Sequence, residues 1–101
     1  MTFEYLCDIK DVPPGTTRTY EIKDRTIALC NVQGNIYAVD DMCTHEEESL
    51  DQGQLDGFEI ECPRHGARFD VRTGEVKALP AVLPIDTFNI RVDGKIVEIE
   101  I

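Results

Sequence analysis

Two short stretches of the chain each place one cysteine close to one histidine. Cys43 and His45 are separated by one residue, Cys62 and His65 by two, and sixteen residues lie between His45 and Cys62. A thiolate and an imidazole this close in sequence can reach a common centre at little cost in loop-closure entropy. The fold must then bring both stretches to one point, where the four side chains can hold a metal centre.

Two cysteines and two histidines are compatible with two kinds of metal centre. One is tetrahedral zinc, and the other is a 2Fe-2S cluster with Cys on one iron and His on the other. Zinc fingers usually pair Cys with Cys and His with His along the chain, whereas each stretch here supplies one of each. The mixed order favours a binuclear centre at which two loops meet.

The remaining sequence is typical of an all-β, antiparallel sandwich or barrel. Short runs of β-branched and aromatic residues recur between turn signals, and no long helix is apparent. Strands are expected at 3–7, 16–22, 26–32, 36–39, 58–61 and 68–71. The acidic, polar stretch from Asp40 to Gln54 predicts a loop, and Ala78 to Pro84, with two prolines, predicts an ordered apolar loop.

Two hairpins are expected from turn residues. Gln33-Gly34-Asn35 predicts a turn, because Gly and Asn tolerate positive φ. At the C-terminus, strands at 85–92 and 95–101 are expected on either side of an Asp93-Gly94 turn. Apolar and acidic side chains alternate in the last strand, which predicts one buried and one solvated face. The alternating residues are Val97, Glu98, Ile99, Glu100 and Ile101.

Length and charge narrow the class of protein. A chain of 101 residues is expected to form one domain, 1–101, with a single site. The net charge of −10 disfavours nucleic acid and anionic membranes as partners and fits a basic protein partner better. The alternative is that the acidity only keeps the protein soluble. No apolar run approaches the roughly 18 to 20 residues of a membrane span, and Met1 to Tyr5 lacks signal-peptide features, so we expect a cytoplasmic protein.

In a reducing compartment, four cysteines are more often metal ligands, catalytic thiols or buried small hydrophobic residues than two disulfides. Cys7 and Cys30 have no nearby His or second Cys and are expected to be buried.

The chain resembles the Rieske family, whose signature is Cys-x-His, a spacer of about this length, and Cys-x-x-His followed by Gly. The resemblance covers nearly the whole chain and is strongest to the soluble ferredoxins of bacterial Rieske non-haem iron, aromatic-ring-hydroxylating oxygenase systems. Beyond the ligands, the similar segments are Val12-Pro13-Pro14-Gly15, 31–40, 69–75 and the loop around Pro80.

The resemblance implies a Rieske-type antiparallel β-sandwich, with a small cluster-binding subdomain formed by two loops, and one Rieske-type 2Fe-2S cluster. Cys43 and Cys62 would bind the buried iron, and His45 and His65 the outer iron, with imidazole edges near solvent. Electrons would enter and leave through those histidines. Pro80 would belong to a loop that shields the cluster.

Respiratory relatives carry an extra cysteine in each ligand loop, where this chain has Glu48 and Arg64. We hypothesise that these two residues form an ion pair. The same relatives place Ser and Tyr hydroxyls near the cluster, where this chain has Ala67 and Phe69. Losing those donors, and having acidic residues at 46–48, should lower the reduction potential to roughly −150 mV.

Glu46 departs from the small or apolar residue that usually follows this histidine in the family, which leaves the exact docking surface open. Arg64 and Arg68 could dock an acidic patch on a partner, or bind local carboxylates instead. Asp70 and Thr73-Gly74 are interpreted as structural.

The resemblance implies an electron carrier and not an enzyme. It would take single electrons from an NAD(P)H-dependent flavoprotein ferredoxin reductase and pass them to a terminal oxygenase, acting as a monomer. The chain is too short for the non-haem iron domain that activates oxygen. Two alternatives stay open: a small Rieske-like subunit of a larger reductase, such as a nitrite reductase, and a structural zinc module without redox chemistry.

Overall fold

Three antiparallel sheets and one short helical turn form the chain in a computed structural model, which describes residues 2–41, 54–61, 67–78 and 84–101. The first sheet has the order β1-β11-β10, with β1 at Phe3–Asp8, β10 at Ile90–Asp93 and β11 at Ile96–Glu100. The central sheet has the order β2-β3-β4-β9, with strands at Thr17–Ile22, Arg25–Val32, Asn35–Asp40 and Thr87–Phe88. The small sheet has the order β5-β6-β7-β8, with strands at Gln54–Asp56, Glu59–Glu61, Arg68–Asp70 and Val76–Ala78. The 3-10 turn η1 spans Ile9–Asp11.

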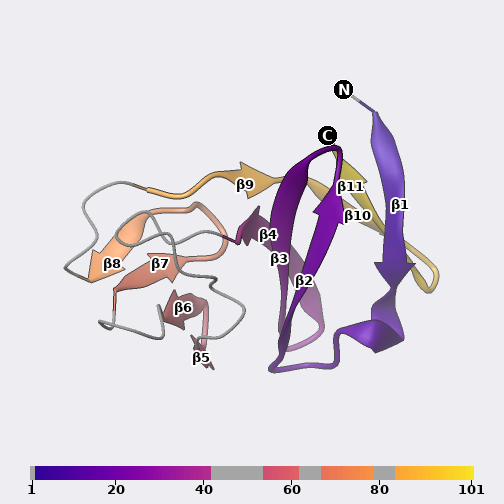
Figure 1. Ribbon diagram of the computed structural model, residues 1–101. Helices are drawn as coiled ribbons and strands as arrows, with labels where there is room; N and C mark the ends of the chain where they lie inside the picture. The colour runs from indigo at the N-terminus through magenta and orange to yellow at the C-terminus, as the bar shows by residue number, and fades with distance from the viewer. Residues whose placement is uncertain (1, 42–53, 62–66, 79–83) are drawn as a thin grey trace.

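This arrangement confirms the expected all-β class. The first and central sheets form a sandwich, and the small sheet lies to one side of it, beyond β4 and β9 (Figure 1). No helix in the described part of the chain has the length and apolar character of a membrane span.

Strand β3 carries a core on each of its faces. Ile27 and Leu29 face the first sheet, whereas Ala28, Cys30 and Val32 face the small sheet, because successive side chains of a strand point in opposite directions. The sandwich core consists of Cys7, Val12, Ile27, Leu29, Ala38, Val97 and Ile99. The second core consists of Ala28, Cys30, Val32, Val39, Ile60, Ala67, Phe69, Val71 and Ile85. Both parts of the molecule are therefore anchored to one strand.

Asn31 is the buried polar residue of β3, and both the nitrogen and the oxygen of its side-chain amide form hydrogen bonds. Its Nδ2 donates to the carbonyl oxygen of Val12 at 2.7 Å, and its Oδ1 accepts from the backbone N–H of Gly34 at 2.8 Å. The first bond fixes the Val12-Pro13-Pro14-Gly15 segment, and the second closes the β3–β4 hairpin. A buried amide satisfied in this way incurs little desolvation penalty.

Most predicted strands are confirmed to within a residue or two, but the sequence did not predict β5 and β8. Each has only three residues, and β5, Gln54–Asp56, is mostly polar. Neither has the composition of a strand, so their extended conformation comes from pairing with β6 and β7. The subdomain expected as two loops therefore has a sheet of its own.

The predicted continuous strand at 85–92 is wrong. The chain forms β9 and β10, interrupted at Asn89, and these strands belong to different sheets. β9 pairs with β4 and β10 with β11, so the chain crosses between the layers of the sandwich here. The turn is also shifted by one residue: Asp93 pairs with Ile96, which leaves Gly94 and Lys95 as the loop. The buried positions of β11 are confirmed, since Val97 and Ile99 are fully buried.

Two hairpins of the central sheet use two-residue loops with positive φ. The expected β3–β4 turn is confirmed, with φ of 55° at Gln33 and 94° at Gly34. The β2–β3 loop has φ of 48° at Lys23 and 63° at Asp24, with no glycine at either position. Such loops match the twist of the flanking strands, but the left-handed region is unfavourable for residues with a Cβ.

We predict that Asp24→Gly stabilises the protein by about 0.5 to 1 kcal/mol. Relief of the left-handed strain, roughly 1 to 2 kcal/mol, exceeds the extra chain entropy of glycine, roughly 0.5 to 1 kcal/mol. The reverse exchange, Gly34→Asp, should destabilise, since a Cβ at that position meets no atom within 4 Å and only the backbone conformation is at issue. Urea unfolding followed by circular dichroism measures both, and a lower stability for Asp24→Gly would contradict the prediction.

Candidate metal centre

The four expected ligands, Cys43, His45, Cys62 and His65, lie outside the described residues. So do the acidic residues Glu46, Glu47 and Glu48, the expected ion-pair residue Arg64, and Pro80. What the structure describes is where the segments that carry these residues begin and end.

Both ligand segments adjoin the same end of the small sheet. Segment 42–53 leads into Gln54, the first residue of β5, and segment 62–66 follows Glu61, the last residue of β6. Gln54 pairs with Glu61, and Glu61 pairs with Arg68 at the start of β7. The ends of the two segments thus lie on neighbouring strands in one row, as the ligand spacing requires.

A third segment adjoins the same row. Segment 79–83 follows Ala78, the last residue of β8, and Ala78 pairs with Arg68. On the central sheet, the backbone N–H of Asp40 donates to the carbonyl oxygen of Asp86 at 2.9 Å. Segment 42–53 therefore begins near the place where segment 79–83 ends. That the Pro80 loop covers a cluster remains a prediction.

The second core lies directly behind this row. Ala67 follows segment 62–66 and is fully buried, and Phe69, two residues further on, is also fully buried. Neither side chain carries a hydroxyl. At these two positions the chain therefore contributes apolar packing to the second core and no hydroxyl donor.

Arg68 binds local carboxylates, which is one of the two roles that the sequence left open for it. Its guanidinium lies 3.1 Å from Asp56, 3.4 Å from Glu61 and 3.6 Å from Glu59. These contacts, with the hydrogen bond to Asp56 the largest cause, raise the pKa of Arg68. Three carboxylates around one cation leave this face of the small sheet negative.

The prediction that Cys7 and Cys30 are buried is confirmed. Cys7 belongs to the sandwich core and Cys30 to the second core. Burial raises the pKa of both thiols, and that of Cys30 to about 12. Both are therefore neutral thiols near pH 7, and a thiol must ionise before it binds a metal. Within the described residues, no three His, Cys, Asp or Glu side chains come together as a metal site.

Hydrogen bonds of Asp70 hold the turn between β7 and β8 of the small sheet. Asp70 is buried and accepts hydrogen bonds from the side chain of Arg72 at 2.8 and 3.1 Å, and these lower the pKa of its carboxyl. Its carbonyl oxygen accepts from the backbone N–H of Gly74 at 2.7 Å. The structural interpretation of Asp70 and Gly74 agrees with these bonds.

The close approach between Gly74 and Ile85 was not predicted. The backbone N–H of Ile85 donates to the carbonyl oxygen of Gly74 at 3.0 Å, and a Cβ on Gly74 would overlap the carbonyl oxygen of Ile85. This contact joins the two residues that flank 75–84, the stretch of chain that contains segment 79–83. Sequence reasoning could identify the turn but not its distant partner.

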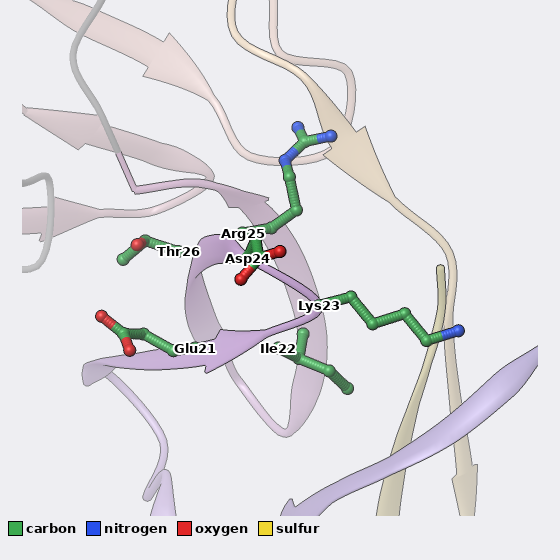
Figure 2. Close-up of a pocket in the computed structure, with 6 residues that line it drawn as sticks. All are labelled: Glu21, Ile22, Lys23, Asp24, Arg25 and Thr26. Carbon is green, nitrogen blue, oxygen red and sulfur yellow. The ribbon is translucent and has the colours of Figure 1, made fainter.

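A surface hollow of the described chain lies at the β2–β3 hairpin (Figure 2). It is lined by six consecutive residues, Glu21 to Thr26. A molecule bound there would contact a single hairpin only, so the hollow has no convergent groups from separate elements.

Comparison with known proteins identifies the family to which these features correspond. The model of the Rieske 2Fe-2S domain matches residues 2–89. The biphenyl dioxygenase ferredoxin subunit of Pseudomonas sp. (strain KKS102) is 41% identical over 96 residues, which cover 94% of this chain and 88% of the relative.

Solved structures agree with the sequence comparison. The ferredoxin of carbazole 1,9a-dioxygenase from Nocardioides aromaticivorans IC177 has a TM-score of 0.93 and 33% identity, covering 98% of this chain and 97% of that one. A chain from the complex of reduced oxygenase and oxidized ferredoxin in carbazole 1,9a-dioxygenase has a TM-score of 0.89 and 36% identity, covering 96% and 91%. A putative small subunit of NADPH nitrite reductase has a TM-score of 0.86 but only 21% identity, over 100% of both chains, which shows a shared fold alone.

We predict that Gly74→Ala destabilises the protein by about 3 kcal/mol or more, because the added Cβ meets backbone that cannot move without breaking the Ile85 contact. Gly15→Ala is the matched control: φ is +82° at Gly15 and +80° at Gly74, but a Cβ at Gly15 meets nothing within 4 Å. The control should cost only about 1 to 2 kcal/mol for the backbone conformation. Equal losses in urea unfolding would show that the contact with Ile85 is unimportant.

Proposed function

This chain belongs to the Rieske 2Fe-2S family, and we propose that it delivers single electrons to the terminal oxygenase of a multicomponent oxygenase system. It is a Rieske-type electron carrier and not itself an enzyme, since the relatives are named ferredoxin components. The single observation that carries the proposal is the family match, which spans residues 2–89 and includes both Cys-and-His stretches.

We propose that Cys43 and Cys62 bind the inner iron of the cluster and that His45 and His65 bind the outer iron. The donor set suits the group, because two thiolates and two imidazoles complete the four ligands of a Rieske centre. The pairing of Gln54 with Glu61 supports it by bringing the flanks of both segments into one row. When bound, the cluster supplies the capacity to hold one added electron.

Two protein partners follow from this role. The solved complex of an oxygenase with a ferredoxin in a related system supports the terminal oxygenase as the electron acceptor. As the donor we propose an NAD(P)H-dependent flavoprotein reductase, because a carrier needs a source of single electrons. The contacts should be small and transient, since a carrier must release each partner as readily as it binds it.

The remaining parts of the proposal concern the state of the protein. We propose one domain over residues 1–101, acting as a monomer in the cytoplasm, with Glu48 and Arg64 as an ion pair between the ligand loops. The net charge of −10 supports a basic docking surface on either partner. The alternative role as a nitrite reductase subunit has support from the fold alone, and the zinc-module alternative does not fit the family.

The decisive experiment is to record visible absorption and low-temperature electron paramagnetic resonance spectra before and after dithionite reduction. We expect a brown protein whose reduced form gives a rhombic signal with a low average g value. Cys43→Ser should abolish both signals. Cys30→Ala, which removes a buried thiol instead, should retain them. A colourless wild-type protein that contains zinc would overturn the proposed function.

The reduction potential tests whether the lack of hydroxyl donors at Ala67 and Phe69 lowers the potential of the proposed cluster. We predict a wild-type value near the low end of the Rieske range, roughly −150 mV, and a value well above zero would contradict it. Ala67→Ser should raise the potential by about 60 mV if the added hydroxyl binds the reduced state about 1.4 kcal/mol more strongly than the oxidised state. Ala38→Ser is the control, since Ala38 is equally buried but belongs to the sandwich core. Protein-film voltammetry on both variants measures the shifts.

A further inference from the structure

The side chain of Arg25 lies where three strand ends of the central sheet meet. Arg25 is the first residue of β3, and its Nη2 lies 3.6 Å from Oδ2 of Asp40 and 3.5 Å from Oδ2 of Asp86. Its guanidinium carbon also lies 5.0 Å from the centroid of the Phe88 ring. Figure 2 shows this side chain extending away from its own hairpin toward β9.

The two carboxylates belong to the chain segments that lead to the candidate metal centre. Asp40 is the last residue of β4, shortly before segment 42–53, and Asp86 lies between segment 79–83 and β9. The Asp40 N–H donates to the Asp86 carbonyl oxygen at 2.9 Å, and the Asp41 N–H donates to the carbonyl oxygen of Thr26 at 3.0 Å. Arg25 thus connects the base of the expected ligand loop to the base of the expected covering loop.

This junction depends on few backbone bonds. β9 has only two residues, Thr87–Phe88, and its register with β4 is limited to two pairs. The carboxylates of Asp40 and Asp86 lie 3.6 and 3.5 Å from Nη2 of Arg25, and like charges brought this close together repel one another. The guanidinium offsets this repulsion and packs against the ring of Phe88.

The ion pairs are too exposed to govern the stability of the whole fold. The side chains of Arg25, Asp40 and Asp86 are 42%, 33% and 77% exposed. Exposed pairs of this kind contribute little to the stability of a whole fold. Their effect is therefore expected at the strand ends and not in the two cores.

We propose that Arg25 is a positioning residue for the cluster. By holding the end of β4 against the start of β9, it fixes where the first ligand loop and the covering loop leave the central sheet. Loss of this contact lets the two loop bases separate, which admits water and hastens loss of the cluster. The proposal rests on the proposed function, because it concerns a bound 2Fe-2S cluster.

The test follows the decay of visible absorbance of the purified holoprotein in air. Arg25→Gln should shorten the cluster lifetime about three- to fivefold, the rate equivalent of about 0.7 to 1 kcal/mol. Arg25→Lys, which keeps the charge, should restore most of the lifetime. Arg25→Gln with Asp86→Asn should restore part of it, because one of the two facing charges is gone. In Arg25→Gln, hydrogen exchange should be faster than in the wild-type protein, and only in peptides that cover the end of β4 and β9.

Arg18→Gln is the matched control. Arg18 also stacks on an aromatic ring, 5.7 Å from the centroid of Tyr20, and its loss changes the net charge equally. It lies on the edge strand β2, where it pairs with Leu29, several residues along the strands from Arg25. This variant should keep the wild-type lifetime.

The proposal is overturned if Arg25→Gln loses the cluster at the wild-type rate, or if Arg18→Gln loses it equally fast. It is also overturned if neither Arg25→Lys nor the double variant recovers any lifetime. The spectra of the wild-type protein separate these results from a failure of the proposed function, because a wild-type protein without the Rieske signal would fail before any variant is compared.

Discussion

The burial of β3 on both faces is the constraint on which the rest of the structure depends. One strand supplies side chains to the sandwich core and to the second core, so neither layer can shift without disturbing the other. Interiors of this kind are close-packed and transmit small displacements. The small sheet, whose strand ends adjoin the segments that carry the expected ligands, is consequently packed against a strand that is buried on both faces.

The segments that carry the expected ligands are attached to strand ends and not to strand faces. Three segments outside the described residues adjoin one row of the small sheet, formed by Gln54, Glu61, Arg68 and Ala78. Two of them also meet at the end of the β4–β9 pair. The proposed cluster would thus be attached to the apolar scaffold at strand ends, without ligands from either core.

A structural feature could be predicted from the sequence where the residues that cause it lie close together along the chain. The ligand spacing, the Gln33-Gly34 turn, the alternation in β11 and the burial of Cys30 are written within a few residues, and they indicated the class, the family and the candidate site. The three-residue strands β5 and β8 carry no such signal, because they exist through pairing. The break at Asn89 was missed because its cause is an exchange of partners between sheets. The Gly74–Ile85 contact joins residues that no local pattern connects.

The two buried thiols have a consequence for the assembly of the cofactor. An unfolded chain would offer four chemically similar cysteines to iron and sulfide, and binding at the wrong pair would trap the chain in a dead-end species. Once both cores have packed, Cys7 and Cys30 are buried in separate cores as neutral thiols, the form that does not bind a metal. If the cluster is held as proposed, packing of both cores before cluster insertion would leave only Cys43 and Cys62 as thiol ligands for iron.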